Sequence, residues 1–227
     1  MSAKATLDLI SRAFSLDLSA RSPIEIPNAN RETLARMFHV CSFSAGAEIG
    51  VEQGEYSEVL CQAIPGVRLL CVDAWRAYPG YRDHVDQRKL DRFFEETTAR
   101  LAPYSGATLV RKFSLDAVTD VPDGSLDFVY IDGNHSFQAC TNDIAEWSKK
   151  VRPGGIIAGH DYVRYYLPNQ IQVVQVVNGW TDAQEITPWF LLGRQEKREG
   201  ELRDTARSWF WVHDPKPRHR GRRPLKQ

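Results

Sequence analysis

The stretch Glu48-Ile49-Gly50-Val51-Glu52-Gln53-Gly54 decides the fold class of this chain. It overlaps a short apolar run, residues 47–51, and leads into a segment whose apolar side chains recur at helical spacing. Glycine at two positions lets a ligand approach the backbone where a Cβ atom would obstruct it, and the first N–H groups of the following helix lack partners within the helix. The stretch therefore predicts a ligand site between a strand and a helix, with an ordinary glycine turn as the plainer alternative.

Short apolar runs alternate with helical patterns on both sides of this stretch. The runs cover residues 47–51, 67–72, 108–110, 126–131 and 155–158. Buried strands that alternate with amphipathic helices are typical of a parallel sheet covered on both faces. Two later runs have no helical stripe between them, so we expect them to pair antiparallel: residues 186–192 and 208–212.

The chain divides into three expected parts. We expect residues 1–45 to form a helical segment that leads into the domain, here called the approach segment. Residues 46–214 should form one domain of ordinary size. Within the approach segment, Asn30 can cap a helix. One face of this helix carries Leu34, Met37, Phe38 and Cys41. Residues 215–227 hold six Lys and Arg and no acid, which predicts a basic, disordered tail.

Composition excludes several classes of protein. The chain has 227 residues, 42% hydrophobic and 26% charged, which excludes wholesale disorder. The four cysteines form no C-x-x-C pair, which argues against a zinc ribbon and favours a reducing compartment. No apolar run approaches the roughly 20 residues of a membrane span, and the first residues lack the apolar core of a signal peptide. We therefore expect a cytoplasmic protein with no membrane partner.

An acid follows the second apolar run. Asp73 comes 19 residues after Gly54, and a carboxylate there can accept both hydroxyls of a ribose. The glycines do not form the G-x-G-x-x-G pattern that a dinucleotide pyrophosphate requires. A nucleotide-cofactor oxidoreductase is therefore the weaker alternative.

Together with four later segments, this pattern resembles the class I S-adenosylmethionine-dependent methyltransferases. Their first motif has the form E/D-x-G-x-x-x-G, and the later segments are Asp73, residues 113–116, residues 127–136 and residues 152–162. The last two look like those of macrocin-type sugar O-methyltransferases and, more distantly, catechol O-methyltransferase. The resemblance implies a Rossmann-like α/β fold with a seven-stranded, mostly parallel sheet, an antiparallel last strand and helices on both faces. It also implies methyl transfer from S-adenosylmethionine to a hydroxyl of a small molecule or sugar.

The resemblance assigns roles around the cofactor. Residues placed against its methionine part are Glu48, Gly50 and Gly54. Asp73 would hold the ribose, Ser114 would contact the adenine, and Asp132 would border the cofactor. Trp75 would cover the adenine face, with core packing as an equal alternative.

A second cluster follows the fourth and fifth runs, whose ends should lie side by side. In catechol-type enzymes a divalent metal binds at the positions of Asp132, His160 and Asp161, and a base stands at that of His135. A neutral histidine can accept a hydroxyl proton near neutral pH, whereas a metal would acidify the hydroxyl directly. Because His160 replaces the usual acid, the ion could be Mg²⁺, Mn²⁺, Fe²⁺ or Zn²⁺. A capping role for His135 and a structural hydrogen bond for His160 are the alternatives.

Other features have simpler explanations. A solvated helix face accounts for Asp143 and Glu146. The basic tail suggests a nucleic-acid methyltransferase or an RNA-binding module, but residues 132–135 lack the N/D-P-P-Y/F pattern of the former. A small-molecule or sugar acceptor is therefore the expected partner.

Overall fold

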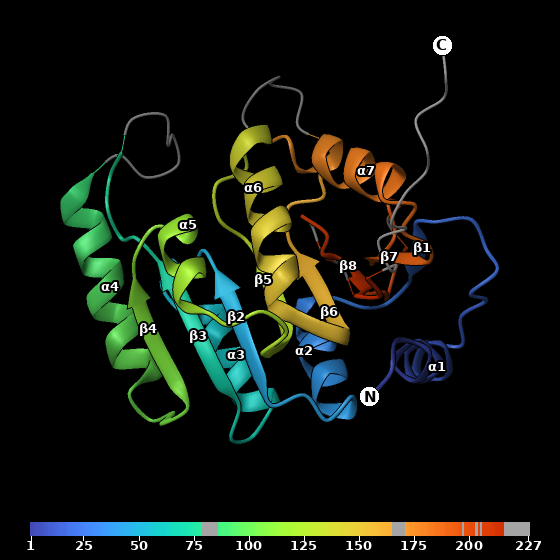
Figure 1. The fold of residues 1–227 in the computed structure, drawn as a ribbon, viewed down its shortest axis with the longest axis horizontal. Helices are drawn as coiled ribbons and strands as arrows, with labels where there is room; N and C mark the ends of the chain where they lie inside the picture. Colours follow the sequence, from blue (N-terminus) through green and yellow to red (C-terminus); the bar gives the residue numbers. More distant parts are fainter. Residues whose placement is uncertain (79–85, 165–170, 197, 203, 205, 216–227) are drawn as a thin grey trace, which may run out of the picture.

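A computed structural model shows one eight-stranded sheet in the order β1-β7-β8-β6-β5-β2-β3-β4 (Figure 1). The structure describes residues 1–78, 86–164, 171–196, 198–202, 204 and 206–215. The basic tail, residues 216–227, thus lies outside the described residues. The strands are β1 (Ile24–Ile26), β2 (Ala45–Ile49), β3 (Arg68–Asp73), β4 (Ala107–Arg111), β5 (Leu126–Ile131), β6 (Val151–Gly159), β7 (Trp189–Leu192) and β8 (Trp209–Val212).

The predicted mostly parallel sheet is confirmed. Neighbours among β2 to β6 pair in parallel, and β8 runs antiparallel to both β6 and β7, as the missing crossover helix requires. The expected count of seven strands is wrong, because β1 adds an eighth, parallel to β7. This strand has only three residues, and it lies between Pro23 and Pro27.

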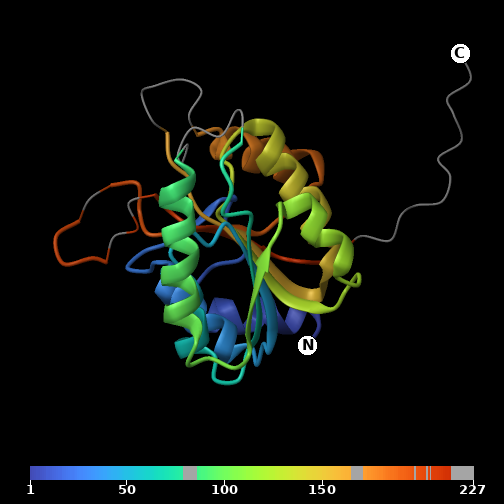
Figure 2. The same cartoon turned by 90° about the vertical axis from the view of Figure 1, so that its left-hand side faces the viewer.

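Helices form two layers around the sheet (Figure 2). The first layer holds α1 (Ala3–Phe14), α2 (Arg31–Val40), α3 (Glu55–Ala63) and α4 (Gln87–Leu101). The second holds α5 (Ser114–Ala117), α6 (Phe137–Trp147) and α7 (Val173–Ala183). Short 3-10 turns, residues 118–120 and 148–150, follow α5 and α6. Side chains of β5 alternate between the layers: Phe128 and Tyr130 join the first core, Val129 and Ile131 the second. Among the described residues, no helix combines the length and the apolarity needed to cross a bilayer.

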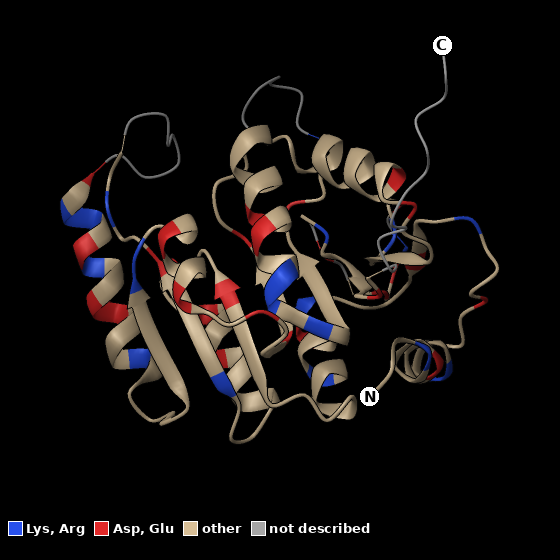
Figure 3. Ribbon diagram, viewed as in Figure 1, with Lys and Arg blue, Asp and Glu red and all other residues tan. Residues whose placement is uncertain are grey.

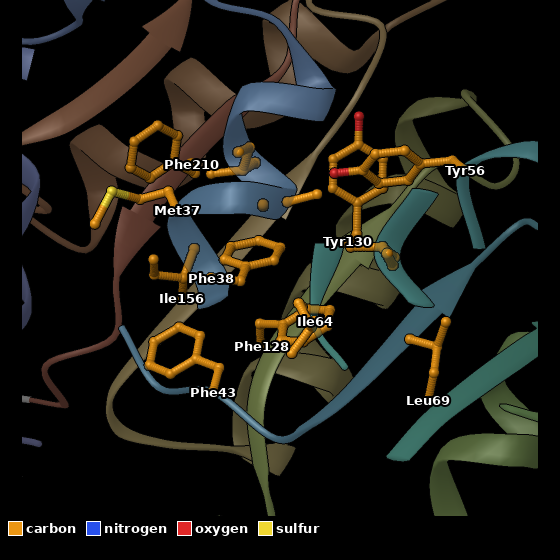
Figure 4. Packing of buried hydrophobic residues seen from close by; sticks show 14 of the residues in the cluster. Met37, Phe38, Phe43, Tyr56, Ile64, Leu69, Phe128, Tyr130, Ile156 and Phe210 are labelled. Atoms are coloured by element: carbon orange, nitrogen blue, oxygen red, sulfur yellow. The ribbon is translucent and has the colours of Figure 1, made fainter. Parts of the chain in front are cut away.

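The first core packs α2 directly on the sheet centre (Figure 4). Asn30 caps this helix, as predicted, by accepting a hydrogen bond from the Thr33 N–H at 3.0 Å. Phe38 stacks on Phe128 with ring centroids 4.3 Å apart, and Gly46 leaves the room that the Phe128 ring fills. The predicted approach segment therefore contributes a helix, α2, that packs on the middle of the sheet and a strand, β1, at its edge.

Candidate active site

A pocket of about 670 Å³ opens at the carboxyl ends of the central strands, a size suited to a small-molecule ligand. Backbone hydrogen bonds hold these ends together: Asp132 N–H donates to Ile49 at 2.7 Å and His160 N–H to Ile131 at 3.0 Å. The pocket wall contains most of the predicted site residues, namely Glu48, Gly50, Asp73, Ser114, Asp132, His135, His160 and Asp161. Figure 3 shows acidic residues at the end of β2 and on α6, and both elements contribute residues to the pocket wall.

The two glycines of the first motif serve different contacts. Gly50 has φ +87°, and a Cβ there would lie 2.1 Å from the Asp132 carbonyl oxygen. The close approach of two strand ends thus requires glycine at this position. Gly54 begins α3 with φ +76°, and its Cβ would meet Thr97 of α4 at 2.9 Å. Gly54 is not part of the pocket wall.

Asp73 holds the glycine turn against β3. Its Oδ2 accepts hydrogen bonds from the N–H groups of Val51 at 3.0 Å and Glu52 at 3.1 Å. Its Oδ1 accepts one from the Trp75 N–H at 2.8 Å. A carboxylate has about four lone-pair sites, so acceptor capacity remains for a ligand hydroxyl.

Trp75 packs in the core. The sequence had left core packing and a contact with the adenine face as equal alternatives for this residue. Its side chain is completely buried, lies edge-on to Phe94 at 5.0 Å, and is not part of the pocket wall. Its indole N–H donates to the Glu52 carbonyl oxygen at 2.8 Å. The assignment of this ring to an adenine face is therefore corrected. Phe113 and Leu115, both partly exposed, line the pocket instead.

Glu48 is a buried residue of the pocket wall. Its carboxylate accepts a hydrogen bond from the Ser57 hydroxyl of α3. Burial raises the pKa of Glu48 to about 8, and the charge of Asp132 adds to the rise while the Ser57 bond opposes it. The folded protein therefore holds this side chain in its protonated form at neutral pH.

His135 lies between two carboxylates, as the strand order predicts. Its Nε2 is 2.9 Å from Asp161 Oδ2 and 3.5 Å from Asp132 Oδ1. Burial opposes ionisation of Asp161, but hydrogen bonds from His135 and His160 hold the pKa of this carboxyl below its usual range. One donor atom each from Asp132, His135 and Asp161 lie within 4.8 Å of one another, which one metal ion could bridge.

His160 contacts a third carboxylate that the sequence analysis missed. Its Nε2 lies 3.2 Å from Asp204 Oδ1, while its Nδ1 lies 3.6 Å from Asp161 and 3.7 Å from Asp132. Burial opposes protonation, but hydrogen bonds to Asp161 and Asp204 raise the pKa of His160 to about 10. Because donor atoms of Asp132, His135 and Asp161 converge, His135 is a further candidate ligand beside the predicted set of Asp132, His160 and Asp161.

Two further pocket residues were missed. Arg31, at the start of α2, places its guanidinium 5.2 Å from the Tyr56 ring centroid and 3.9 Å from Asp132 Oδ2. Asp143 was predicted on a solvated face, but it is 5% exposed and lines the pocket. Glu146 does lie on the outer face, where Lys149 pairs with it at 2.6 Å. The sequence held a signal for Asp143, because residues 140, 143, 144 and 147 form one buried helical stripe.

Comparison with known proteins shows the family to which this chain belongs. A family model described as a methyltransferase domain matches residues 47–162, half of the chain. A relative from Sinorhizobium fredii, the uncharacterized protein y4gI, is 25% identical over 121 residues. The match covers 50% of this chain but only 12% of that protein.

Solved structures of methyltransferases share the fold. An O-methyltransferase from Bacillus cereus in complex with S-adenosylhomocysteine gives a TM-score of 0.57 at 15% identity, covering 93% of this chain and 90% of that one. TomG from Streptomyces achromogenes, an O-methyltransferase of tomaymycin synthesis bound to S-adenosylmethionine, gives 0.57 at 18% identity, covering 94% and 92%. A Thermotoga maritima O-methyltransferase gives 0.55 at 15% identity, covering 92% and 73%. The turn of the first motif and the strand order agree with the family match. The chain belongs to the methyltransferase-domain family.

Proposed function

We propose that this chain transfers the methyl group of S-adenosylmethionine to a hydroxyl of a small molecule or sugar. The observation that carries the proposal is the position of His135, which two carboxylates hold at the open end of the pocket. A hydroxyl keeps its proton at neutral pH, so methyl transfer to its oxygen needs a proton acceptor beside it. A more acidic nucleophile loses its proton without such an acceptor. The O-methyltransferases that share the fold agree with this assignment.

His135 supplies the base in this proposal. When bound, the cofactor would supply an electrophilic methyl group, whose bond to sulfur would break as its bond to the acceptor oxygen formed, with S-adenosylhomocysteine as the leaving group. The imidazole of His135 takes the hydroxyl proton as this bond forms. Asp161, 2.9 Å away, orients the ring and stabilises the resulting imidazolium.

Binding of the cofactor product tests the proposal directly. In isothermal titration calorimetry, the wild-type protein should bind S-adenosylhomocysteine, and NAD should give no heat. Asp73→Ala should weaken that binding by about 1–3 kcal/mol, the cost of losing a hydrogen bond to a charged group. Asp73→Asn keeps one acceptor oxygen, which can serve the Val51 and Glu52 N–H groups but not also the Trp75 N–H, so it serves as the companion variant that retains part of the turn. Unchanged affinity in a folded Asp73→Ala protein would exclude the ribose contact, and tight NAD binding would favour the oxidoreductase instead.

A metal-assisted reaction is the second candidate, favoured by the convergence of Asp132, His135 and Asp161. Two carboxylates and one imidazole fit a divalent ion, and the nitrogen suits Mn²⁺, Fe²⁺ or Zn²⁺ better than Mg²⁺. Such an ion would lower the pKa of the acceptor hydroxyl. His135 would then be a ligand, because its lone pair cannot serve both roles.

Metal removal separates the two roles of His135. If it is the base, methyl transfer persists in EDTA, and Mn²⁺ titrated into the apoprotein gives no saturable heat. Activity that disappears in EDTA and returns with Mn²⁺ would assign the ligand role. In that case Asp161→Ala should also abolish the calorimetric Mn²⁺ signal, while Asp182→Ala, on α7 and outside the pocket wall, should leave it unchanged.

A further inference from the structure

A short turn carries the proposed base from the end of β5 to the start of α6. It runs from Asp132 to Phe137, the first residue of α6, and His135 lies in its middle. A backbone hydrogen bond fixes Asp132 to β2. Inside the turn, Asn134 Oδ1 accepts a hydrogen bond from the Ser136 N–H at 2.9 Å. The part of the turn that follows His135 lies outside the sheet and before the helix, so it needs a support of its own.

Gln172, the residue that precedes α7, supplies this support with two hydrogen bonds. Its backbone N–H donates to the His135 carbonyl oxygen at 2.9 Å. Its side-chain Oε1 accepts a hydrogen bond from the Phe137 N–H at 2.8 Å. One residue that is distant in sequence thus holds the two peptide groups on either side of Ser136. These bonds fix the direction in which the His135 side chain leaves the turn.

The helix behind Gln172 makes this support rigid. α7 lies beside α6 (Figure 1). Its side chains Val173, Val176 and Val177 are buried in the second core, so the backbone at Gln172 has a fixed position. Functional groups held by packed helices and strands are placed more precisely than those held by loops alone. Through Gln172, the turn that carries His135 gains the support of a packed helix.

Stability alone gives a weak reason for the side-chain bond. Phe137 is 51% exposed, and water can satisfy the N–H group of a first helical residue. The bond to Gln172 therefore replaces a bond to water, and the net gain is small. Ser136 already caps α6 by accepting a hydrogen bond from the Ala139 N–H at 3.4 Å. The place of a catalytic group matters far more, since a misplacement of 1 Å can lower a rate about 10²-fold.

We infer that Gln172 is a positioning residue for the proposed reaction. Its side-chain carbonyl holds the turn so that the His135 imidazole stays beside Asp161 and faces the acceptor hydroxyl. This inference rests on the proposed function, since it takes His135 as the base. Gln172 is not part of the pocket wall, so it acts through His135 and not on the ligand. Its loss should therefore lower the rate of methyl transfer and leave the binding of both substrates unchanged.

Gln172→Met tests the inference, because methionine has a similar length but offers only a weak acceptor. Carbon relaxation-dispersion NMR follows the Cε1–H signal of His135, which is assigned by its loss in His135→Ala. This signal should show microsecond-to-millisecond exchange in Gln172→Met and none in the wild-type protein. Gln172→Glu keeps an oxygen for the Phe137 N–H and should restore the wild-type signal. With a hydroxyl acceptor that the wild-type protein methylates, Gln172→Met should lower kcat about 10- to 100-fold at unchanged KM.

Gln184→Met is the matched control, because Gln184 is an exposed glutamine at the other end of α7. It should change neither the His135 signal nor the turnover. A His135 signal without exchange in a folded Gln172→Met protein would overturn the inference and leave Gln172 a capping residue. A Gln172→Glu protein that behaves like Gln172→Met would overturn it too. Exchange at His135 together with near-normal turnover of His135→Ala would instead refute the proposed base, so the two failures are distinguishable.

Discussion

Replacing His135 by alanine is expected to lower the turnover of methyl transfer by roughly 10²- to 10⁴-fold, the usual contribution of a positioned proton acceptor. The affinity for S-adenosylhomocysteine should remain close to that of the wild-type protein, because His135 faces Asp132 and Asp161 at the acceptor end. Single-turnover assays with an identified hydroxyl acceptor measure the first quantity, and calorimetry measures the second.

His39→Ala is the control for this variant. His39 is an exposed histidine on α2 that does not belong to the pocket wall, so its loss should change neither turnover nor affinity. Near-normal turnover in His135→Ala would return this residue to a structural role. A parallel fall in cofactor affinity and turnover would show that the substitution damages the whole pocket.

Replacing Glu48 by glutamine is expected to stabilise the protein at neutral and alkaline pH. In the folded protein the pKa of Glu48 is about 8, against an ordinary value of 4.5. Between these values the folded state holds a proton that the unfolded chain has released, so the free energy of unfolding falls as pH rises. The slope is at most about 1.4 kcal/mol per pH unit, which amounts to several kcal/mol across the window. Glutamine carries no charge and keeps an acceptor oxygen for Ser57.

Urea unfolding at a series of pH values measures this effect. The difference between Glu48→Gln and the wild-type protein should be small near pH 4.5, grow with pH, and level off above about pH 8. Glu95→Gln, an exposed acid on α4, is the control and should leave the pH dependence unchanged. Curves for Glu48→Gln and wild type that stay parallel across the whole range would show that Glu48 ionises normally in the fold.

Local sequence patterns predicted the central part of this fold well. Residues 126–131 form β5 with the predicted bounds, because a buried strand between two helical layers needs an unbroken apolar run. The glycine turn and the strand-end acids also meet as predicted, since parallel strands end at one edge. In contrast, β1 was missed because three residues between prolines carry no periodicity, and its pairing with β7 joins segments far apart in the chain.

The individual bonds of the site were harder to predict. Arg31 reaches Asp132 and Asp204 reaches His160 from segments distant in sequence, and only tertiary packing brings them there. Asp204 in particular orients His160, because it lies 3.2 Å from Nε2 while Nδ1 faces Asp132 and Asp161. Asp143 differs, since its place in an apolar helical stripe was visible and was outweighed by the general rule that acids are solvated.

The short strand β1 also protects the sheet against association with other chains. Without it, the backbone N–H and C=O groups of Trp189–Leu192 would form an open edge, and open edges are templates for intermolecular strand pairing. A chain that begins after residue 30 would therefore expose a row of large apolar residues beside unpaired backbone groups. Since β1 itself has only three residues, it closes this edge without offering a long one of its own. The N-terminal segment thus favours a monodisperse protein over an aggregating one.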